Sequence, residues 1–126
     1  MVNVIIDQPD CDFYIKHYQD GQLTLNTGEQ IQESMLYFVD QVPQAWPITD
    51  IAGLSQLHFQ PIIDYQPEVM ILGTGERQIF PGMERLLPLQ SQGIGVEIMH
   101  NIAACQTFNL LADEGRKVLL ALIVNP

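Results

Sequence analysis

The chain has 126 residues, 47% of them hydrophobic, and carries a formal net charge of −10. This length and apolar content predict one domain, spanning residues 1–126, and exclude a disordered tail protein. The negative charge argues against nucleic-acid binding and against electrostatic docking on anionic lipid, because both need clustered Lys and Arg.

The first third of the chain is predicted to be rich in β-structure. Residues 13–18 alternate between apolar and polar side chains, which indicates a strand. The Gln-Asp-Gly-Gln sequence at 19–22 supplies a turn into a second strand at 23–25. A further extended segment covers 29–39 and ends in a run of apolar residues.

The middle of the chain begins with a segment that lacks periodicity. We expect residues 41–56 to form an ordered loop that Trp46 pins onto the core. Residues 58–64 then predict a short helix, with Pro61 tolerated only in its first turn.

A buried strand is the next predicted element. Residues 68–72 are almost continuously apolar, which is typical of a strand covered on both faces, and Gly73-Thr74-Gly75 ends it. A brief strand at 78–80 and a helix within 82–92 follow. Pro88 indicates that this helix starts late or is kinked.

The C-terminal third gives the clearest pattern. Residues 94–99 predict a strand, Asn101 is a suitable N-cap, and residues 102–114 predict a helix that Gly115 closes in the left-handed conformation. A buried strand at 117–124 ends the pattern.

The polar side chains of this last predicted helix form a narrow stripe of three residues, Gln106, Asn109 and Asp113. Such a stripe indicates a helix mostly surrounded by protein. Strand-helix-strand alternation after a β-rich start predicts an α/β fold, with helices packed on a mixed sheet.

Two sequence blocks resemble a known family. The first is the PEVMILGTG sequence at 67–75 followed by Phe80-Pro81, and the second is GIGVEIM at 93–99 followed by matches through Arg116. The family is the uncharacterised one that includes the mitochondrial respiratory complex I assembly factor 3 and the adipogenesis-associated protein. The resemblance implies a three-layer single domain, with a central mixed five-stranded sheet, helices on its faces and an additional N-terminal β portion.

The chain departs from this family at two places. His100-Asn101 stands where relatives often have Asp-Thr, and Gln106 stands where many have Arg. The second departure removes a contact that an anion or a partner could use. The family supplies no established catalytic residues, so the resemblance leans against an enzyme.

A few polar residues are candidates for a ligand site. Thr74 and Arg77 follow a buried strand, although Gly73-Thr74-Gly75 is better explained as a tight turn that needs positive φ than as a phosphate-binding loop. Glu97 lies between apolar neighbours, and Arg116 is its candidate partner. Asn109 is a candidate pocket or interface residue.

The remaining reactive side chains favour structural roles. Cys105 falls on the apolar side of the last predicted helix and is expected to be buried, while Cys11 lies between two aspartates that disfavour its thiolate. The three histidines lack metal-ligand spacing, so neither a metal nor a cofactor is expected.

Two functions from different classes remain open. The first, which the resemblance implies, is a non-enzymatic interaction factor that assists assembly of a membrane complex, perhaps a respiratory one. The second is a small-molecule-binding protein or enzyme that uses Thr74, Arg77 and a desolvated Glu97 in one pocket. Scattered or solvent-facing positions for these three would count against it.

Expectations for partners and location complete the sequence-based account. A protein partner is expected, and self-association as a homodimer is a further option. The N-terminus has no basic, apolar signal segment, and the longest apolar run has seven residues at 118–124. We therefore expect a cytoplasmic protein without direct membrane insertion.

Overall fold

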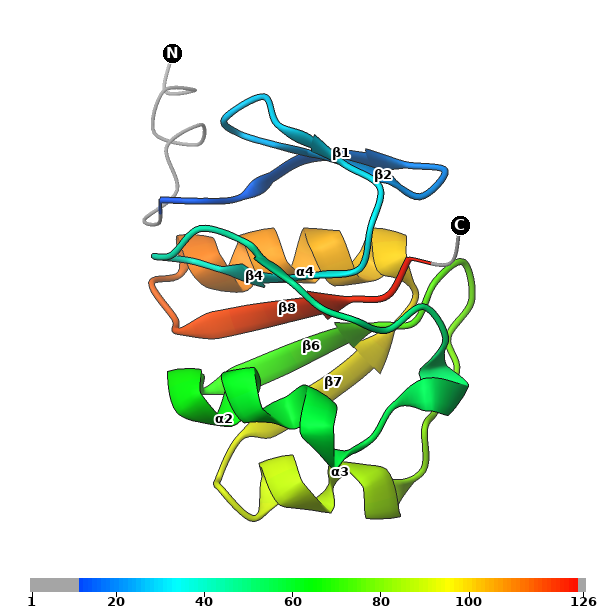
Figure 1. Ribbon diagram of the computed structural model, residues 1–126. Coiled ribbons are helices and arrows are strands. Elements are labelled where there is room, and N and C mark those ends of the chain that lie inside the picture. The colour runs from blue at the N-terminus through cyan, green and yellow to red at the C-terminus, as the bar shows by residue number, and fades with distance from the viewer. Residues whose placement is uncertain (1–11, 125–126) are drawn as a thin grey trace.

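A mixed five-stranded sheet forms the centre of the molecule, as the computed structural model shows for residues 12–124 (Figure 1). The strand order is β5-β4-β8-β6-β7. β6 runs parallel to β7 and β8, whereas β4 is antiparallel to β5 and β8. The strands are β4 (Met35–Phe38), β5 (Gln44–Ala45), β6 (Val69–Gly73), β7 (Gly95–Met99) and β8 (Val118–Leu122).

A second, three-stranded antiparallel sheet is formed by β1 (Ile15–Gln19), β2 (Gln22–Leu25) and β3 (Gln30–Ile31). The turn between β1 and β2 has positive φ at Asp20 (50°) and Gly21 (79°). Positive φ at both central residues matches the twist of the flanking strands, and Asp-Gly tolerates it. The turn expected at residues 19–22 is thus confirmed.

The helices cover both faces of the large sheet. Helix α4 (Asn101–Asp113) lies between the two sheets, where Phe108 and Cys105 belong to an apolar cluster with side chains of β2 and β8. On the other face lie α2 (Gln60–Tyr65) and α3 (Met83–Gln90), with the 3-10 helices η1 (Ile51–Gly53) and η2 (Gln56–Phe59). Figure 1 shows α3 in the layer farthest from the small sheet.

The strands at the centre are buried along their whole length. Every residue of β6 and of β8 is buried, as their continuous apolar runs predict. Trp46 is also buried, and its indole N–H donates to the carbonyl oxygen of His58 at 2.9 Å. This bond fixes the loop before η1 against the helical layer, in the role expected of the tryptophan. The α/β fold with an additional N-terminal β portion is confirmed.

Several predicted elements differ from the observed ones. The extended segment 29–39 is split between the two sheets, and the break falls at Ser34, whose buried hydroxyl accepts a hydrogen bond from the N–H of Val124 at 2.8 Å. No strand forms at 78–80, where the chain is exposed. Helix α3 starts at Met83 and keeps Pro88 inside it, so its start is not delayed.

The start of α4 also differs from prediction. His100, not Asn101, is the N-cap, and its Nδ1 accepts from the N–H of Ala103 at 3.3 Å. The two sheets cover much of the helix, but Ile102 and Leu110 remain exposed. Within the predicted polar stripe, Gln106 and Asp113 are exposed, whereas Asn109 is half-buried.

Two tyrosines give a direct test of buried hydroxyl pairing. Tyr37 is buried and its hydroxyl has no partner among residues 12–124, whereas the Tyr65 hydroxyl donates to Oδ1 of Asp40 at 2.7 Å. Because an unpaired buried hydroxyl stabilises nothing, Tyr37→Phe should leave the free energy of unfolding unchanged or raise it. Tyr65→Phe should lower it by about 1 kcal/mol. Urea unfolding measures both, and an equal loss in the two variants would contradict the assignment.

Candidate functional site

The carboxyl ends of β6 and β7 meet at a buried asparagine. Asn101 is only 1% exposed, and its Oδ1 accepts from the N–H of Gly75 at 2.9 Å. Its Nδ2 donates to the Tyr18 hydroxyl and to the carbonyl oxygen of Ile123, each at 2.9 Å. One side chain thereby joins the small sheet, the end of β8 and the loop after β6.

The two glycines of the Gly-Thr-Gly sequence are required for different structural reasons. A Cβ on Gly73 would stand 2.6 Å from Oδ1 of Asn101 and 2.6 Å from Cδ1 of Leu122, so this position needs glycine for close packing. Gly75 instead has φ +106° and nothing near its missing Cβ. The predicted turn with positive φ is confirmed at Gly75 only.

Thr74 organises the loop that follows β6. Its hydroxyl donates to the carbonyl oxygen of Arg77 and accepts from the N–H of Ile79 at 3.1 Å, while its own N–H donates to the carbonyl oxygen of Met99. The side chain is buried. Thr74 thus closes the loop on itself, and its hydroxyl is engaged within the protein.

The other predicted site residues lie apart. The side chains of Arg77 and Glu97 are exposed, and Arg116 pairs through Nε with Oε1 of Glu68 at 3.4 Å. Glu68 precedes β6 whereas Thr74 follows it, so Arg116 lies at the opposite end of the sheet from Thr74. The Glu97–Arg116 pair considered from the sequence is therefore replaced by Glu68–Arg116.

Asn109 binds the edge of the small sheet. Its Oδ1 accepts from the N–H of Ile15 at 2.8 Å, and its Nδ2 donates to the carbonyl oxygen of the same residue at 2.7 Å. The amide therefore stands in for a neighbouring strand and docks β1 on α4. Thr74, Arg77, Glu97, Asn109 and Arg116 do not line one common pocket.

Cys105 is a packing residue. It is 4% exposed, and burial raises the pKa of its thiol to about 12. A thiol of this kind is a poor nucleophile near neutral pH. Cys11 lies outside the described residues. Within residues 12–124, no group of three or more His, Cys, Asp or Glu side chains is placed to hold a metal ion.

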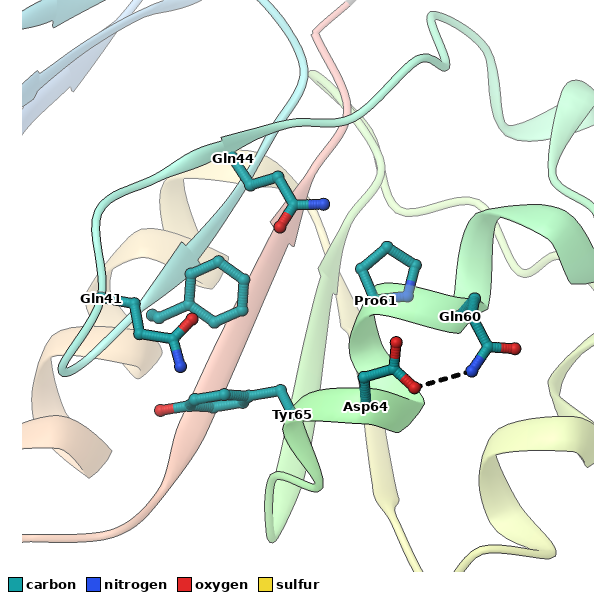
Figure 2. A pocket seen from close by; sticks show the side chains of 7 residues that line it. Gln41, Gln44, Gln60, Pro61, Asp64 and Tyr65 are labelled. Carbon is teal, nitrogen blue, oxygen red and sulfur yellow. Dashed lines mark hydrogen bonds between the residues drawn. The ribbon is translucent and has the colours of Figure 1, made fainter.

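A polar pocket of about 360 Å³ opens between α2 and the segment that joins β4 to β5 (Figure 2). Tyr65 packs against Phe38 edge to face, with ring centroids 4.8 Å apart. Within α2, Nε2 of Gln60 donates to Oδ1 of Asp64 at 2.7 Å. The lining residues of this polar pocket are Phe38, Gln41, Gln44, Gln60, Pro61, Asp64 and Tyr65.

Sequence reasoning missed this polar pocket. Gln60 and Asp64 are four residues apart on one helix, so the sequence alone could have predicted that their side chains lie close together. Gln41 and Gln44 lie in a stretch without periodicity, and only the tertiary fold brings them opposite α2. A second pocket, of about 410 Å³, is more apolar and contains Trp46, Ile48 and Val124 in its lining.

Four of the eight large apolar residues that are exposed in the described part of the chain lie between positions 79 and 87. Met83 and Leu87 lie one helical turn apart on α3 and are 77% and 56% exposed, and Ile79 and Phe80 in the preceding loop are exposed as well. We call these four residues the α3 apolar patch. Nη1 of Arg85 donates to the carbonyl oxygens of Ile51 and Ala52 at 3.0 and 3.3 Å, which holds the helix against η1.

The layered α/β architecture and the Gly-Thr-Gly loop define a recognisable class of small domain. Residues 15–123 match the model of a family described as "Protein of unknown function (DUF498/DUF598)". The chain belongs to this family, and the resemblance noted in the sequence is confirmed.

Three relatives indicate the range of the family. A "13 kDa major membrane protein" of Francisella tularensis is 32% identical over 87% of this chain and 89% of its own length. The human NADH dehydrogenase [ubiquinone] 1 alpha subcomplex assembly factor 3 is 35% identical over 90% of this chain, which spans 61% of that protein. The crystal structure of a Bordetella parapertussis protein superposes with a TM-score of 0.83 at 32% identity, covering 90% of this chain and 96% of that one.

One of these relatives has a name that mentions a membrane, and a helix that spans a bilayer needs about 20 apolar residues. Across residues 12–124, no helix combines the length and the apolar character needed to span a bilayer.

The close approach at Gly73 predicts a large effect of a single methyl group. Gly73→Ala should lower the free energy of unfolding by about 2 to 3 kcal/mol, because the added Cβ overlaps Asn101 and Leu122. Gly53→Ala is the matched control, since nothing lies within 4 Å of that Cβ and the change should have little effect or stabilise. Chemical denaturation compares the two, and equal stabilities would refute the packing argument.

The buried thiol predicts protection from alkylation. At pH 8, iodoacetamide should modify Cys105 far more slowly in the native protein than in urea, because a pKa of about 12 instead of the ordinary 9 lowers the thiolate fraction about a thousandfold. Mass spectrometry of peptides separates Cys105 from Cys11. Rapid native labelling of Cys105 would show that the thiol is accessible.

Proposed function

We propose that this protein is a non-enzymatic interaction factor that assists assembly of a multisubunit membrane complex, with a respiratory complex as the first candidate. The α3 apolar patch is the observation that carries the proposal. Family membership supports it, because a relative is named as an assembly factor for NADH dehydrogenase. The physical step of such a function is transient burial of apolar surface against a client protein.

The patch has the properties of a binding surface. Exposed apolar area gains about 25 cal/mol per Å² when a partner removes it from water. Met83 adds an unbranched, adaptable side chain, which suits contact with more than one client surface. The bonds from Arg85 to η1 keep α3 in place, so little ordering entropy is lost on binding.

The alternative function, a small-molecule-binding protein or enzyme with a pocket near Gly73–Arg77 and Glu97, has less support. The Thr74 hydroxyl is occupied by its own loop, and the side chains of Arg77 and Glu97 are exposed. A catalytic acid or base normally needs a partly desolvated setting that shifts its pKa. No specific observation at these strand ends favours the alternative.

The proposal predicts that the patch is required for client capture. Met83→Gln combined with Leu87→Gln removes apolar surface at two exposed positions while keeping good helix formers. Affinity purification from detergent-solubilised membranes of the source cell, quantified by mass spectrometry, should lose specific clients about tenfold. The readout is recovery of membrane-complex subunits by the wild-type chain.

The matched control is Ile102→Gln combined with Leu110→Gln, which removes exposed apolar surface from α4 instead. This control should retain the clients, and both double variants should match the wild type in thermal unfolding. Equal loss in the two variants would reject the patch as the client surface. Recovery of the protein alone, with a doubled mass in light scattering, would favour self-association over the assembly function.

A further inference from the structure

The solvent side of α3 carries an apolar ridge. Leu86 and Leu89 pack into the core on one side of the helix. Met83 and Leu87, one turn apart on another side, face solvent at positions where a surface helix usually carries polar residues. Phe80, three residues before Met83, is 69% exposed. Side chains four residues apart form the ridges that pack into the grooves of a neighbouring helix, so this side of α3 suits a helical partner.

The surroundings of this ridge are acidic. Glu84 is exposed and lies three residues before Leu87 on the same helix, so its carboxylate borders the ridge. Residues 41–66, which form η1, η2 and α2 in the same layer, contain two exposed carboxylates, Asp50 and Asp64, and no Lys or Arg. The helical layer around α3 therefore has a negative surface charge.

The basic residues near the ridge offset these acids only in part. Arg85 is the one base of α3, and its Nη1 donates to two carbonyl oxygens of η1, so the guanidinium is directed at the protein. Arg77, in the loop before the ridge, follows Glu76, and the two charges cancel. The net charge of −10 on the whole chain adds a long-range attraction for cations. A positively charged partner is therefore favoured over a negatively charged one.

We propose that the α3 apolar patch binds a basic amphipathic helix, in which an apolar stripe is bordered by Lys or Arg. The stripe packs along Phe80, Met83 and Leu87, and the cations of its border meet Glu84. This inference rests on the proposed assembly function, because it names the segment of the client that the patch recognises. Membrane proteins carry Lys and Arg next to their apolar helices on one side of the bilayer, so subunits of a membrane complex contain segments of this chemistry.

The test titrates three peptides of about 18 residues, long enough for a helix, into the intact chain labelled with ¹³C at its methionine methyl groups. The basic peptide has a stripe of Leu and a polar side of Lys. The acidic peptide has Glu in place of every Lys, and the shuffled peptide keeps the composition of the basic one without its stripe. The basic peptide should shift the methyl signal of Met83, which Met83→Leu assigns. The other two should bind at least about tenfold more weakly, because they lack the complementary charge or the continuous apolar side.

Variants of the chain locate the binding on α3, with isothermal titration calorimetry as the readout. Met83→Gln combined with Leu87→Gln removes the ridge and should weaken binding of the basic peptide at least about tenfold. Glu84→Gln removes the bordering carboxylate and should weaken it about threefold. Asp113→Asn removes the same charge from the exposed end of α4 and should leave the affinity unchanged. The backbone amide spectrum of each variant checks its folding.

Equal affinity for the basic and acidic peptides would overturn the inference, and equal weakening by Glu84→Gln and Asp113→Asn would replace it with diffuse electrostatic attraction. Binding to vesicles of phosphatidylcholine and phosphatidylglycerol, without binding to the basic peptide, would overturn it in favour of a lipid surface. The assembly function can fail separately. Selective binding of the basic peptide without recovery of membrane-complex subunits supports the inference and rejects that function, whereas recovery of subunits without selectivity among the peptides does the reverse.

Discussion

The buried amide of Asn101 is the contact on which the arrangement of the layers depends. It satisfies a donor from the loop after β6 and two acceptors from different sheets, all within a space that excludes water. An unpaired amide in such a place would cost several kcal/mol, so the position accepts few other side chains. The glycine opposite it is a consequence, because only a residue without a side chain leaves room for the amide.

Helix α4 connects the Asn101 contact to the small sheet and to the apolar core. Asn101 begins the helix, and Asn109, two turns later, binds β1 through both of its amide atoms. Between them, Cys105 and Phe108 are buried in the apolar cluster that both sheets share. Helix α4 thus holds the small sheet through the hydrogen bonds of Asn101 and Asn109 and through the apolar contacts of the shared cluster. The α3 apolar patch and the polar pocket beside α2 lie on the other side of the large sheet.

Secondary-structure elements that depend on neighbouring residues along the chain could be predicted from the sequence. The continuous apolar runs of β6 and β8 and the left-handed Gly115 place strands and the end of α4 without tertiary information. Asn101 was assigned a capping role because its neighbours along the chain suggested one, whereas its partners are up to 83 residues away. The polar pocket escaped prediction for the same reason, since Gln41 and Gln44 meet α2 only in the folded chain.

The bond between the Gln78 side chain and the carbonyl oxygen of Ile98, at 2.8 Å, has a consequence for how sheets of different molecules meet. β7 is an outer strand of the large sheet, and such strands offer a template on which another chain adds. Gln78 occupies an acceptor there, and the exposed carboxylate of Glu97 sits beside it. An incoming strand would have to displace the Gln78 side-chain amide and desolvate the Glu97 carboxylate. This edge of the large sheet is therefore less open to strand addition at Ile98 than a bare outer strand would be.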